Sequence, residues 1–316
     1  MDIKKDMIEI LPAWCSDVPY QIKGIAVKEA HQAFFKANGR PKFRARKNSE
    51  QSCFIPKSAI RKTGIYPRIS GKGLYFHEDL PECPKDSRLV WRYEKWWLAV
   101  PHTEKLRKTE NQGPVVALDP GVRSFISFYS PDFSGNIGKG DFSRIQRLCC
   151  HLDNLISKRD RCKNKQKRRS LTKATRRMRA KIRDMITELH YKTAKFLTDN
   201  FSVILLPTFE TGQMTLKGGR KIRKKTARMM LTFSHYRFKG ILRWKASQNG
   251  AVVADCCEAY TSKTHPQTGE VRKVGGAKWI RLTDGSMADR DITGARNILL
   301  RALADSPTDF ICAVND

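Results

Sequence analysis

Acidic residues and long apolar runs are the two things that this chain of 316 residues has little of. Asp and Glu number 31 against 61 Lys and Arg, which gives a formal net charge of +30. So basic a chain is rare among enzymes of small molecules, and a polyanion is its natural partner. No apolar run approaches the roughly 18 residues of a membrane-spanning helix, and no signal peptide opens the chain. We therefore expect an intracellular protein that binds nucleic acid and no membrane.

The cysteines show no pattern of pairs. Their number is nine, which is odd, and their spacing is irregular. This fits a reducing compartment better than a secreted domain held by disulfides. Cys256 and Cys257 are adjacent and have no second pair nearby, so we expect them to pack at the end of a strand and not to bind metal.

Two short apolar runs each lead to a carboxylate. Residues 115–118 directly precede Asp119, and residues 203–206 come shortly before Glu210. Apolar runs of this length between turn residues predict central strands, which would hold the two acids rigidly at neighbouring positions. Each acid also has a simpler interpretation, because Asp119 opens a good turn tripeptide and Glu210 could be a solvated strand end.

A third acid comes from residues 289–291, which begin the last predicted helix. Asp289 or Asp291 could simply cap that helix. Three acids on rigid elements could instead hold two hard cations about 3.5–4 Å apart, the arrangement that hydrolyses phosphodiesters. Oxygen ligands suit Mg²⁺ or Mn²⁺.

Four stretches occur together in an order that is typical of one family. They are Leu118–Arg123, the strand that leads to Glu210, Tyr260–Thr264 and Asp289–Asn297. The sequence resembles the RuvC-like nuclease core of the transposon-encoded TnpB proteins and their eukaryotic and viral relatives, the Fanzor proteins, over roughly residues 49–303.

The resemblance implies a function and a set of site residues. It implies an RNA-guided DNA endonuclease associated with a transposable element, with a guide RNA and a DNA target as partners. The catalytic acids implied are Asp119, Glu210 and Asp291, which would also hold Mg²⁺ or Mn²⁺. The compartment would be the nucleus in a eukaryotic host and the cytoplasm otherwise.

The expected fold class is α/β with an all-β N-terminal part. By resemblance, an RNase H-like (RuvC) core carries a basic helical-hairpin insertion and follows a small β-barrel wedge-like domain. The domains expected are a remnant of a helical recognition region with a linker (1–48), the wedge-like barrel (49–112), the first part of the core (113–140), the basic insertion (141–200), the second part of the core (201–255), a degenerate zinc-ribbon-like, target nucleic-acid-binding insertion (256–288) and the third part of the core (289–316).

Positive charge is concentrated in the predicted hairpin. Between Lys158 and Arg183 there are fourteen Lys or Arg and one acid, Asp160. A nuclear-import signal or a disordered loop would also be basic, but a phosphate backbone would relieve the repulsion on such a helix. A second cluster precedes the next helix. The residues expected to bind nucleic acid are Lys158, Arg159, Arg161, Lys163, Lys165, Lys167, Arg168, Arg169, Lys173, Arg176, Arg177, Arg179, Arg220, Lys221, Arg223, Lys224 and Lys225.

The chain departs from the family pattern at the zinc ribbon. A structural zinc site needs four Cys or His side chains in two close pairs. Here His265, Thr268, Arg281 and Asp284 stand where the four cysteines would be, so we expect no zinc. A small metal-free hairpin core is expected instead, from Val271, Val274, Trp279 and Ile280.

The front of the chain also departs from the pattern. One helix is predicted at 17–38, with Ser16 and Asp17 as its cap and Pro19 in its first turn. Family members begin with a further strand and more recognition helices, so we expect an N-terminally shortened copy. A nucleic-acid-binding protein that no longer cuts, either a domesticated regulator or an inactive remnant, is therefore the alternative function.

Two further predictions concern packing. Residues 227–249 are expected to form one helix with a mostly apolar face. The tryptophans of residues 88–100 are expected in short antiparallel strands, where they serve as core more often than as a stacking platform for bases.

Overall fold

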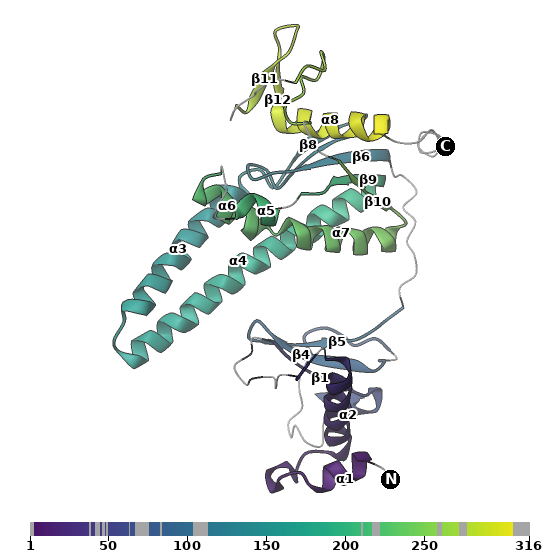
Figure 1. Cartoon of the computed structure of the whole chain (residues 1–316), viewed down its shortest axis with the longest axis vertical. Coiled ribbons are helices and arrows are strands. Elements are labelled where there is room, and N and C mark those ends of the chain that lie inside the picture. The colour runs from purple at the N-terminus through teal and green to yellow at the C-terminus, as the bar shows by residue number, and fades with distance from the viewer. Residues whose placement is uncertain are drawn as a thin grey trace. The chain divides into compact units, whose positions relative to one another are not determined.

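The computed structural model describes most of the chain, in two compact units. The described residues are 3–37, 39–41, 45, 48, 50–62, 64–66, 76–82, 84–103, 113–209, 211–216, 222–257, 261–271 and 277–305. One unit comprises Met1–Thr103 and the other Glu104–Asp316, and each is described by itself (Figure 1).

The first unit combines helices with small antiparallel sheets. Strand β4 is the middle of a three-stranded sheet of order β1-β4-β5, and β2 pairs with β3. The elements are α1 (Ile3–Glu9), η1 (Ala13–Cys15), α2 (Tyr20–Lys36), β1 (Glu50–Ile55), η2 (Lys57–Ala59), β2 (Ile60–Arg61), β3 (Gly64–Ile65), β4 (Ser87–Arg92) and β5 (Lys95–Ala99).

Two predictions for the front of this unit are wrong in detail. The prediction of a single helix missed α1. Helix α2 begins later than predicted, because Pro19 is its N-cap residue and no side chain caps it, so Ser16 and Asp17 do not have that role. Proline fits at this boundary because it has no backbone N–H and its φ is fixed near the helical value.

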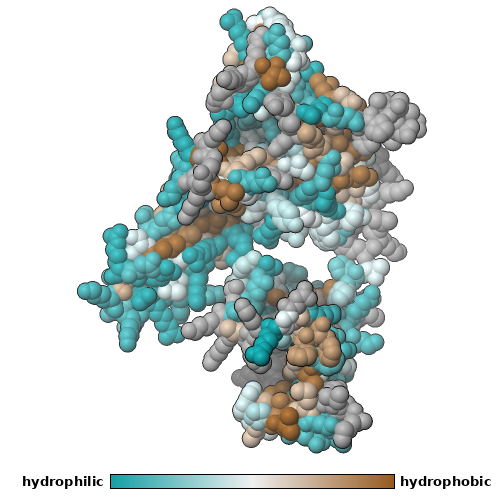
Figure 2. Space-filling model, viewed as in Figure 1, coloured by the Kyte–Doolittle hydropathy of each residue, from teal (hydrophilic) through white to brown (hydrophobic). Residues whose placement is uncertain are grey.

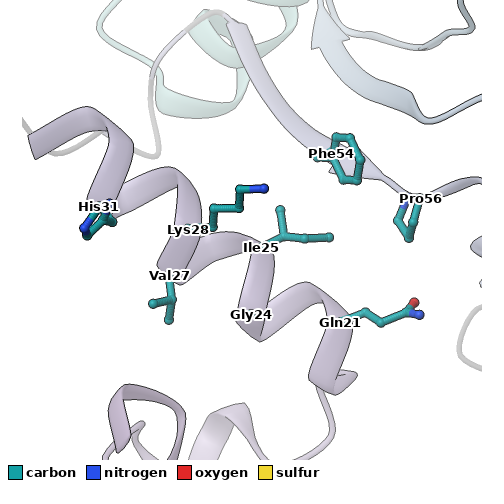
Figure 3. Close-up of a pocket in the computed structure, with 8 residues that line it drawn as sticks. All are labelled: Gln21, Gly24, Ile25, Val27, Lys28, His31, Phe54 and Pro56. Atoms are coloured by element: carbon teal, nitrogen blue, oxygen red, sulfur yellow. The ribbon is translucent and has the colours of Figure 1, made fainter. Parts of the chain in front are cut away.

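The sheet of this unit buries few of its aromatic side chains. Its core is a small cluster around Ile55, Ile60 and Ile65. Trp96 and Trp97 are 60% and 53% exposed, so these two side chains are not the core residues that the sequence suggested. A cavity of about 510 Å³ lies between α2 and β1, where Ile25 and Lys28 extend toward Phe54 (Figure 3).

The second unit is built on a five-stranded mixed sheet. The strand order is β10-β9-β6-β7-β8, with β9 parallel to both β6 and β10 and with antiparallel pairing from β6 through β8. The strands are β6 (Gly113–Pro120), β7 (Ile126–Tyr129), β8 (Ser134–Ile137), β9 (Phe201–Pro207) and β10 (Val252–Cys256), and β11 (Trp279–Arg281) and β12 (Met287–Asp289) form a separate hairpin.

Helices cover both faces of this sheet (Figure 1). Alternation along β6 explains the two cores, because successive side chains of a strand point to opposite faces. Val116 and Leu118 join the larger cluster, with α3, α4, α6 and α7, and Val115 and Ala117 join the cluster with α8. The helices are α3 (Asp141–Arg161), α4 (Lys165–Asn200), α5 (Thr211–Thr215), α6 (Lys224–Phe233), α7 (His235–Asn249) and α8 (Arg290–Asp305).

Helices α3 and α4 form the predicted hairpin. Asn164 begins α4, since its side chain accepts a hydrogen bond of 3.0 Å from the N–H of Lys167. The carboxyl half of α4 packs on the sheet through Ile182, Ile186 and Ala194, as its apolar spacing predicted. The distal half extends away from the sheet, and hydrophilic side chains dominate its surface (Figures 1 and 2).

The single helix predicted over residues 227–249 is in fact two helices. Ser234 has a φ of 51°, in the left-handed region, and it separates α6 from α7. The prediction failed here because serine seldom adopts this conformation, and no glycine or proline marks the break. The break makes His235 the first residue of α7. None of the helices in the described ranges is long and apolar enough to cross a membrane.

Two buried histidines stack on one aromatic ring. The rings of His190 and His235 stack on Phe125 at centroid distances of 5.2 and 5.0 Å. Burial lowers the pKa of each histidine from 6.5 to about 4. Both side chains are therefore neutral at pH 7, and protonating either one inside the core would cost stability.

The first prediction concerns stability in mild acid. The unfolded chain binds protons on these histidines as the pH falls through 6.5, whereas the folded chain does so only near pH 4. Between pH 7.5 and 5 the free energy of unfolding should fall by about 2 kcal/mol per histidine. Urea titrations at the two pH values measure this change, and His190→Gln should remove about half of it. A stability that is constant or rises over this interval would contradict the burial of both rings.

Candidate active site

Asp119 lies on the face of the sheet that α8 covers. It occupies the same side of β6 as Val115 and Ala117, and its cross-strand partner on β7 is Ser127. In the parallel pair, Ala117 lies opposite Leu205, so Asp119 is level with the end of β9. The sequence prediction of neighbouring strands is confirmed for β6 and β9. Glu210, which follows β9, lies outside the described residues.

A glycine of α8 lets the helix approach this carboxylate closely. A Cβ atom on Gly294 would lie 2.6 Å from Oδ2 of Asp119, closer than real Cβ atoms approach other atoms. Asp291 precedes Gly294 by three residues, and residues three apart share one side of a helix. The fold therefore brings Asp119 and Asp291, two of the three predicted acids, to the same side of α8.

The two acids of residues 289–291 have different roles. Asp289 caps α8, since its Oδ1 accepts a hydrogen bond of 3.0 Å from the N–H of Asp291. Its Oδ2 accepts a longer one, 3.4 Å, from Nδ2 of Asn136, whose Oδ1 accepts one of 2.6 Å from the hydroxyl of Ser127. These contacts tie β7, β8 and the start of α8 together and position Asp291. The sequence did not indicate the parts played by Ser127 and Asn136, because they depend on strand pairing.

The electrostatic surroundings of Asp291 are unusual for a carboxylate. Burial raises the pKa of its carboxyl above the ordinary value. The positive charge of Arg123 opposes this shift, and the negative charge of Asp289 adds to it. A half-buried carboxyl next to another acid is the environment in which a bound cation would favour the charged form. No group of three metal-ligating side chains occurs within the described ranges, which leave out Glu210.

The residues after Gly294 anchor the loop that enters the predicted target-binding insertion. Asn297 is buried and donates hydrogen bonds of 2.9 and 2.8 Å to the carbonyls of Thr261 and Thr264. Arg296 donates one of 2.8 Å to the carbonyl of Pro266. One turn of α8 therefore packs against the acid and holds the neighbouring loop, which explains why these residue types occur together.

Hydrogen bonds join the positions where zinc-binding cysteines would stand. His265 is buried, its Nε2 donates to the carbonyl of Arg281 at 3.1 Å, and its Nδ1 accepts from the N–H groups of Gln267 and Thr268 at 3.4 Å. Gln267 accepts two hydrogen bonds from Thr283, at 2.7 and 2.6 Å. Side chains thus connect the two loops that a metal would connect in a zinc ribbon. That the protein binds no zinc stays a prediction.

The apolar core predicted for this hairpin is wrong for two of its members. Val271 and Trp279 are 59% and 48% exposed, and Val274 lies outside the described residues. The region is too small to bury large side chains, so polar contacts hold it instead. Cys256 packs beside the α8 cluster as predicted, whereas Cys257 is exposed.

The predicted nucleic-acid-binding residues lie mostly on the hairpin. Lys158, Arg159 and Arg161 end α3, Lys163 lies in the turn, and eight more lie on the first half of α4. All of these side chains are exposed except Arg159, which is half-buried and paired with Asp160.

The described part of the second basic cluster lies at the root of the hairpin. Arg223 is the N-cap of α6, which starts with Lys224 and Lys225. The ammonium of Lys225 lies 5.9 Å from the ring of Phe142 in α3. Farther along α6, Arg228 forms an ion pair with Asp153, also in α3. The described part of the second cluster therefore contacts α3 near the base of the hairpin, whereas the first cluster lies along the distal part of the hairpin. Arg220 and Lys221 lie outside the described residues.

Comparison with known proteins finds similar sequences in large viruses. A protein of Paramecium bursaria Chlorella virus 1, named provisionally as a transposase, is 31% identical over 245 residues, which is 76% of this chain and 56% of that protein. A TnpB-like protein of Acanthamoeba polyphaga mimivirus is 24% identical over 215 residues, 65% of this chain and 40% of the relative. The chain thus spans about half the length of these relatives.

A family model and a solved structure also match. The model described as the Cas12f1-like TNB domain covers residues 235–298, which include Asp289, Asp291 and Gly294. A solved complex of Cas12f1 with single-guide RNA and target DNA has a TM-score of 0.44 and 16% identity, over 73% of this chain and 50% of that one. A likeness at this level carries no conclusion about function.

The structure defines an α/β protein in which a covering helix closely approaches an acid of the mixed central sheet. The sequence matches and the family model support the TnpB family, the resemblance that the motifs predicted.

The second prediction tests the approach of α8 to Asp119. Gly294→Ala should displace the carboxylate or the helix, at a cost of about 1–3 kcal/mol in the free energy of unfolding. Gly240→Ala in α7 is the matched control, because a Cβ there would meet nothing within 4 Å. That control should stabilise the protein by up to about 1 kcal/mol. Urea denaturation of both variants measures the difference, and equal effects would mean that the close approach is relaxed in solution.

Proposed function

We propose that the protein is a metal-dependent, RNA-guided DNA endonuclease of the TnpB/Fanzor type, with an RNase H-like core. The observation that carries the proposal is the close approach of Gly294 in α8 to Asp119, near the end of β6, a central strand that is covered on both faces. Asp291 lies three residues before Gly294 and therefore on the same side of α8. The mixed sheet of order β10-β9-β6-β7-β8 supports it, since this is the strand order expected of an RNase H-like fold.

The donor set fits a hard divalent cation. Asp119 and Asp291 supply carboxylate oxygens, and Glu210 is proposed as the third ligand from its position in the motif. Mg²⁺ or Mn²⁺ bound there would supply an activated water and would stabilise the leaving oxygen of a phosphodiester. The chain's own contribution is to hold the carboxylates rigidly: Gly294 lets α8 approach, and the cap made by Asp289 fixes the start of the helix.

Nucleic-acid binding is assigned to the basic hairpin and the start of α6. Exposed cations lie along the distal part of the hairpin and at the start of α6. We propose that these cations bind a guide RNA and its DNA target by neutralising their phosphates, in the nucleus of a eukaryotic host or in the cytoplasm of a prokaryotic one. The alternative, a binding protein without cleavage, is favoured if the unaltered protein binds nucleic acid and does not cut it.

The third prediction concerns the acids. Asp119→Asn, Glu210→Gln and Asp291→Asn should each lower Mg²⁺- or Mn²⁺-dependent cutting of single-stranded DNA by about 10²-fold or more, because each removes several kcal/mol of charge stabilisation. DNA affinity should stay within about twofold, since it depends on many distant cations. Cleavage of labelled DNA and filter binding measure the two effects. Undiminished cutting by all three variants would refute the assigned site, and no cutting by the unaltered protein would leave the binding protein as the better description.

The fourth prediction concerns the hairpin. The variant Arg168→Gln/Arg169→Gln should weaken RNA binding and reduce the slope of log affinity against log salt by up to about 0.7 for each phosphate that is no longer neutralised. The control is Lys192→Gln/Lys195→Gln on the same helix, where the two lysines are paired with Glu188 and Asp199. Affinities measured from 50 to about 300 mM salt report the slopes. Equal slopes for the two variants would mean that the distal hairpin does not bind RNA.

A further inference from the structure

A small basic pocket lies where the hairpin joins the helices of the core. Its volume is about 270 Å³, and residues of α3, α4, α6 and the first turn of α7 line it. Four of the lining side chains are arginines, namely Arg179, Arg183, Arg228 and Arg237. Among the described residues, no Asp or Glu lines this pocket. Only Arg179 belongs to the basic residues that the sequence singled out.

The fold assembles the pocket from separate stretches of the chain. Arg179 and Arg183 lie four residues apart, on the same side of α4 as Ile182 and Ile186. These two isoleucines are buried in the main core cluster, whereas the arginines are more exposed. The break at Ser234 separates α6 from α7, and both helices line the pocket. The pocket therefore has an apolar floor and a basic rim.

Two of the four arginines have acidic partners. The guanidinium of Arg228 donates to both carboxylate oxygens of Asp153. Arg183 forms an ion pair with Asp184 at 3.7 Å. A guanidinium paired in this way is held in position and its charge is compensated. These two arginines therefore shape the rim and are not the groups on which a ligand depends.

The other two arginines give the rim an excess of positive charge. Arg179 and Arg237 are exposed, and neither forms an ion pair within the part of the chain that the structure describes. They belong to different helices and line the same small pocket, so a single anion there faces both. The apolar floor keeps water away from one side, which strengthens the attraction relative to an open surface.

The pocket favours a phosphate group over other ligands. A guanidinium presents its donors in a planar fork that fits a phosphate group with two hydrogen bonds. The volume is below the roughly 300–1,000 Å³ of pockets for drug-sized molecules, so one compact group fits better than a whole small molecule. Arg176 is also exposed and lies one turn before Arg179 on the same side of α4. A chain of repeated anionic groups can reach both positions, which favours a nucleic-acid backbone over an isolated carboxylate.

We propose that this pocket binds one phosphate group of a nucleic-acid backbone, held by the guanidinium groups of Arg179 and Arg237. The proposal rests on the proposed function, because it takes nucleic acid as the partner of the hairpin, but it requires neither the catalytic acids nor a metal. Phosphate contacts fix the register of a protein on a nucleic acid and carry no sequence information. A phosphate held here sets the point at which the strand crosses from the hairpin to the core.

Nuclear magnetic resonance of the arginine side chains tests the site directly. The whole protein is labelled with ¹⁵N at Nε of arginine, and the two signals are assigned by their loss in Arg179→Lys and Arg237→Lys. A short single-stranded RNA should shift both signals, and inorganic phosphate should shift them at higher concentration. Sodium chloride of the same ionic strength should shift neither. Equal shifts with sodium chloride, or no shift with RNA, would overturn the proposal. Shifts with inorganic phosphate and none with RNA would leave a site for free phosphate only.

Arginine-to-lysine variants separate a built site from diffuse charge. Lysine keeps the charge and loses the fork, so Arg179→Lys/Arg237→Lys should raise the Kd of the RNA about tenfold. Arg243→Lys is the matched control, because this arginine of α7 pairs with Asp255 and does not line the pocket. Its Kd should stay within about twofold of that of the unaltered protein, since exposed ion pairs contribute little. Equal Kd values for the double variant and the control would overturn the proposal. The measurement needs no cleavage, so RNA binding with this dependence in a protein that does not cut DNA would refute only the proposed nuclease.

Discussion

The close approach of α8 to β6 is the constraint on which the candidate site depends. Strand β6 is covered on both faces, so a side chain on either face meets a packed layer. Asp119 occurs on the α8 face, and only a residue without Cβ leaves room there for its carboxylate. The next turn of the helix continues into Asn297, which holds the adjoining loop. Helix α8 therefore contacts both the candidate catalytic acid of the sheet and the region predicted to bind the target.

Much of this arrangement was predictable from local sequence. The apolar run before Asp119 has the pattern of a strand buried on both faces, and α4 shows its core-facing residues at helical spacing. The family motif predicted that Asp119 and Asp291 belong to one site. The break at Ser234 was not predictable, because it requires a backbone conformation that serine rarely adopts. The positioning role of Asn136 was also hidden, since it arises from strand pairing and not from spacing.

Hydrogen bonds connect the two loops of the region that was compared with a zinc ribbon. A metal replaces the core that so few residues cannot form. In this chain a buried imidazole and an amide make short connections between the same two loops. Such hydrogen bonds are each worth about 1 kcal/mol, far less than a structural zinc ion. Val271 and Trp279 are exposed, so they add little apolar core to this region. The hydrogen bonds from Arg296 and Asn297 of α8 help to hold it in place.

The distribution of charge separates binding from chemistry. The cations lie mainly on the exposed hairpin, whereas Asp291 lies half-buried among groups that oppose one another electrostatically. Removal of one exposed cation changes affinity slightly, because many similar cations remain. Removal of one acid leaves no substitute, because Gly294 and Asp289 shape the site around those particular carboxylates. If the proposed function holds, a copy without the acids would therefore keep its affinity for nucleic acid, which is the physical basis on which such an enzyme could become a binding protein.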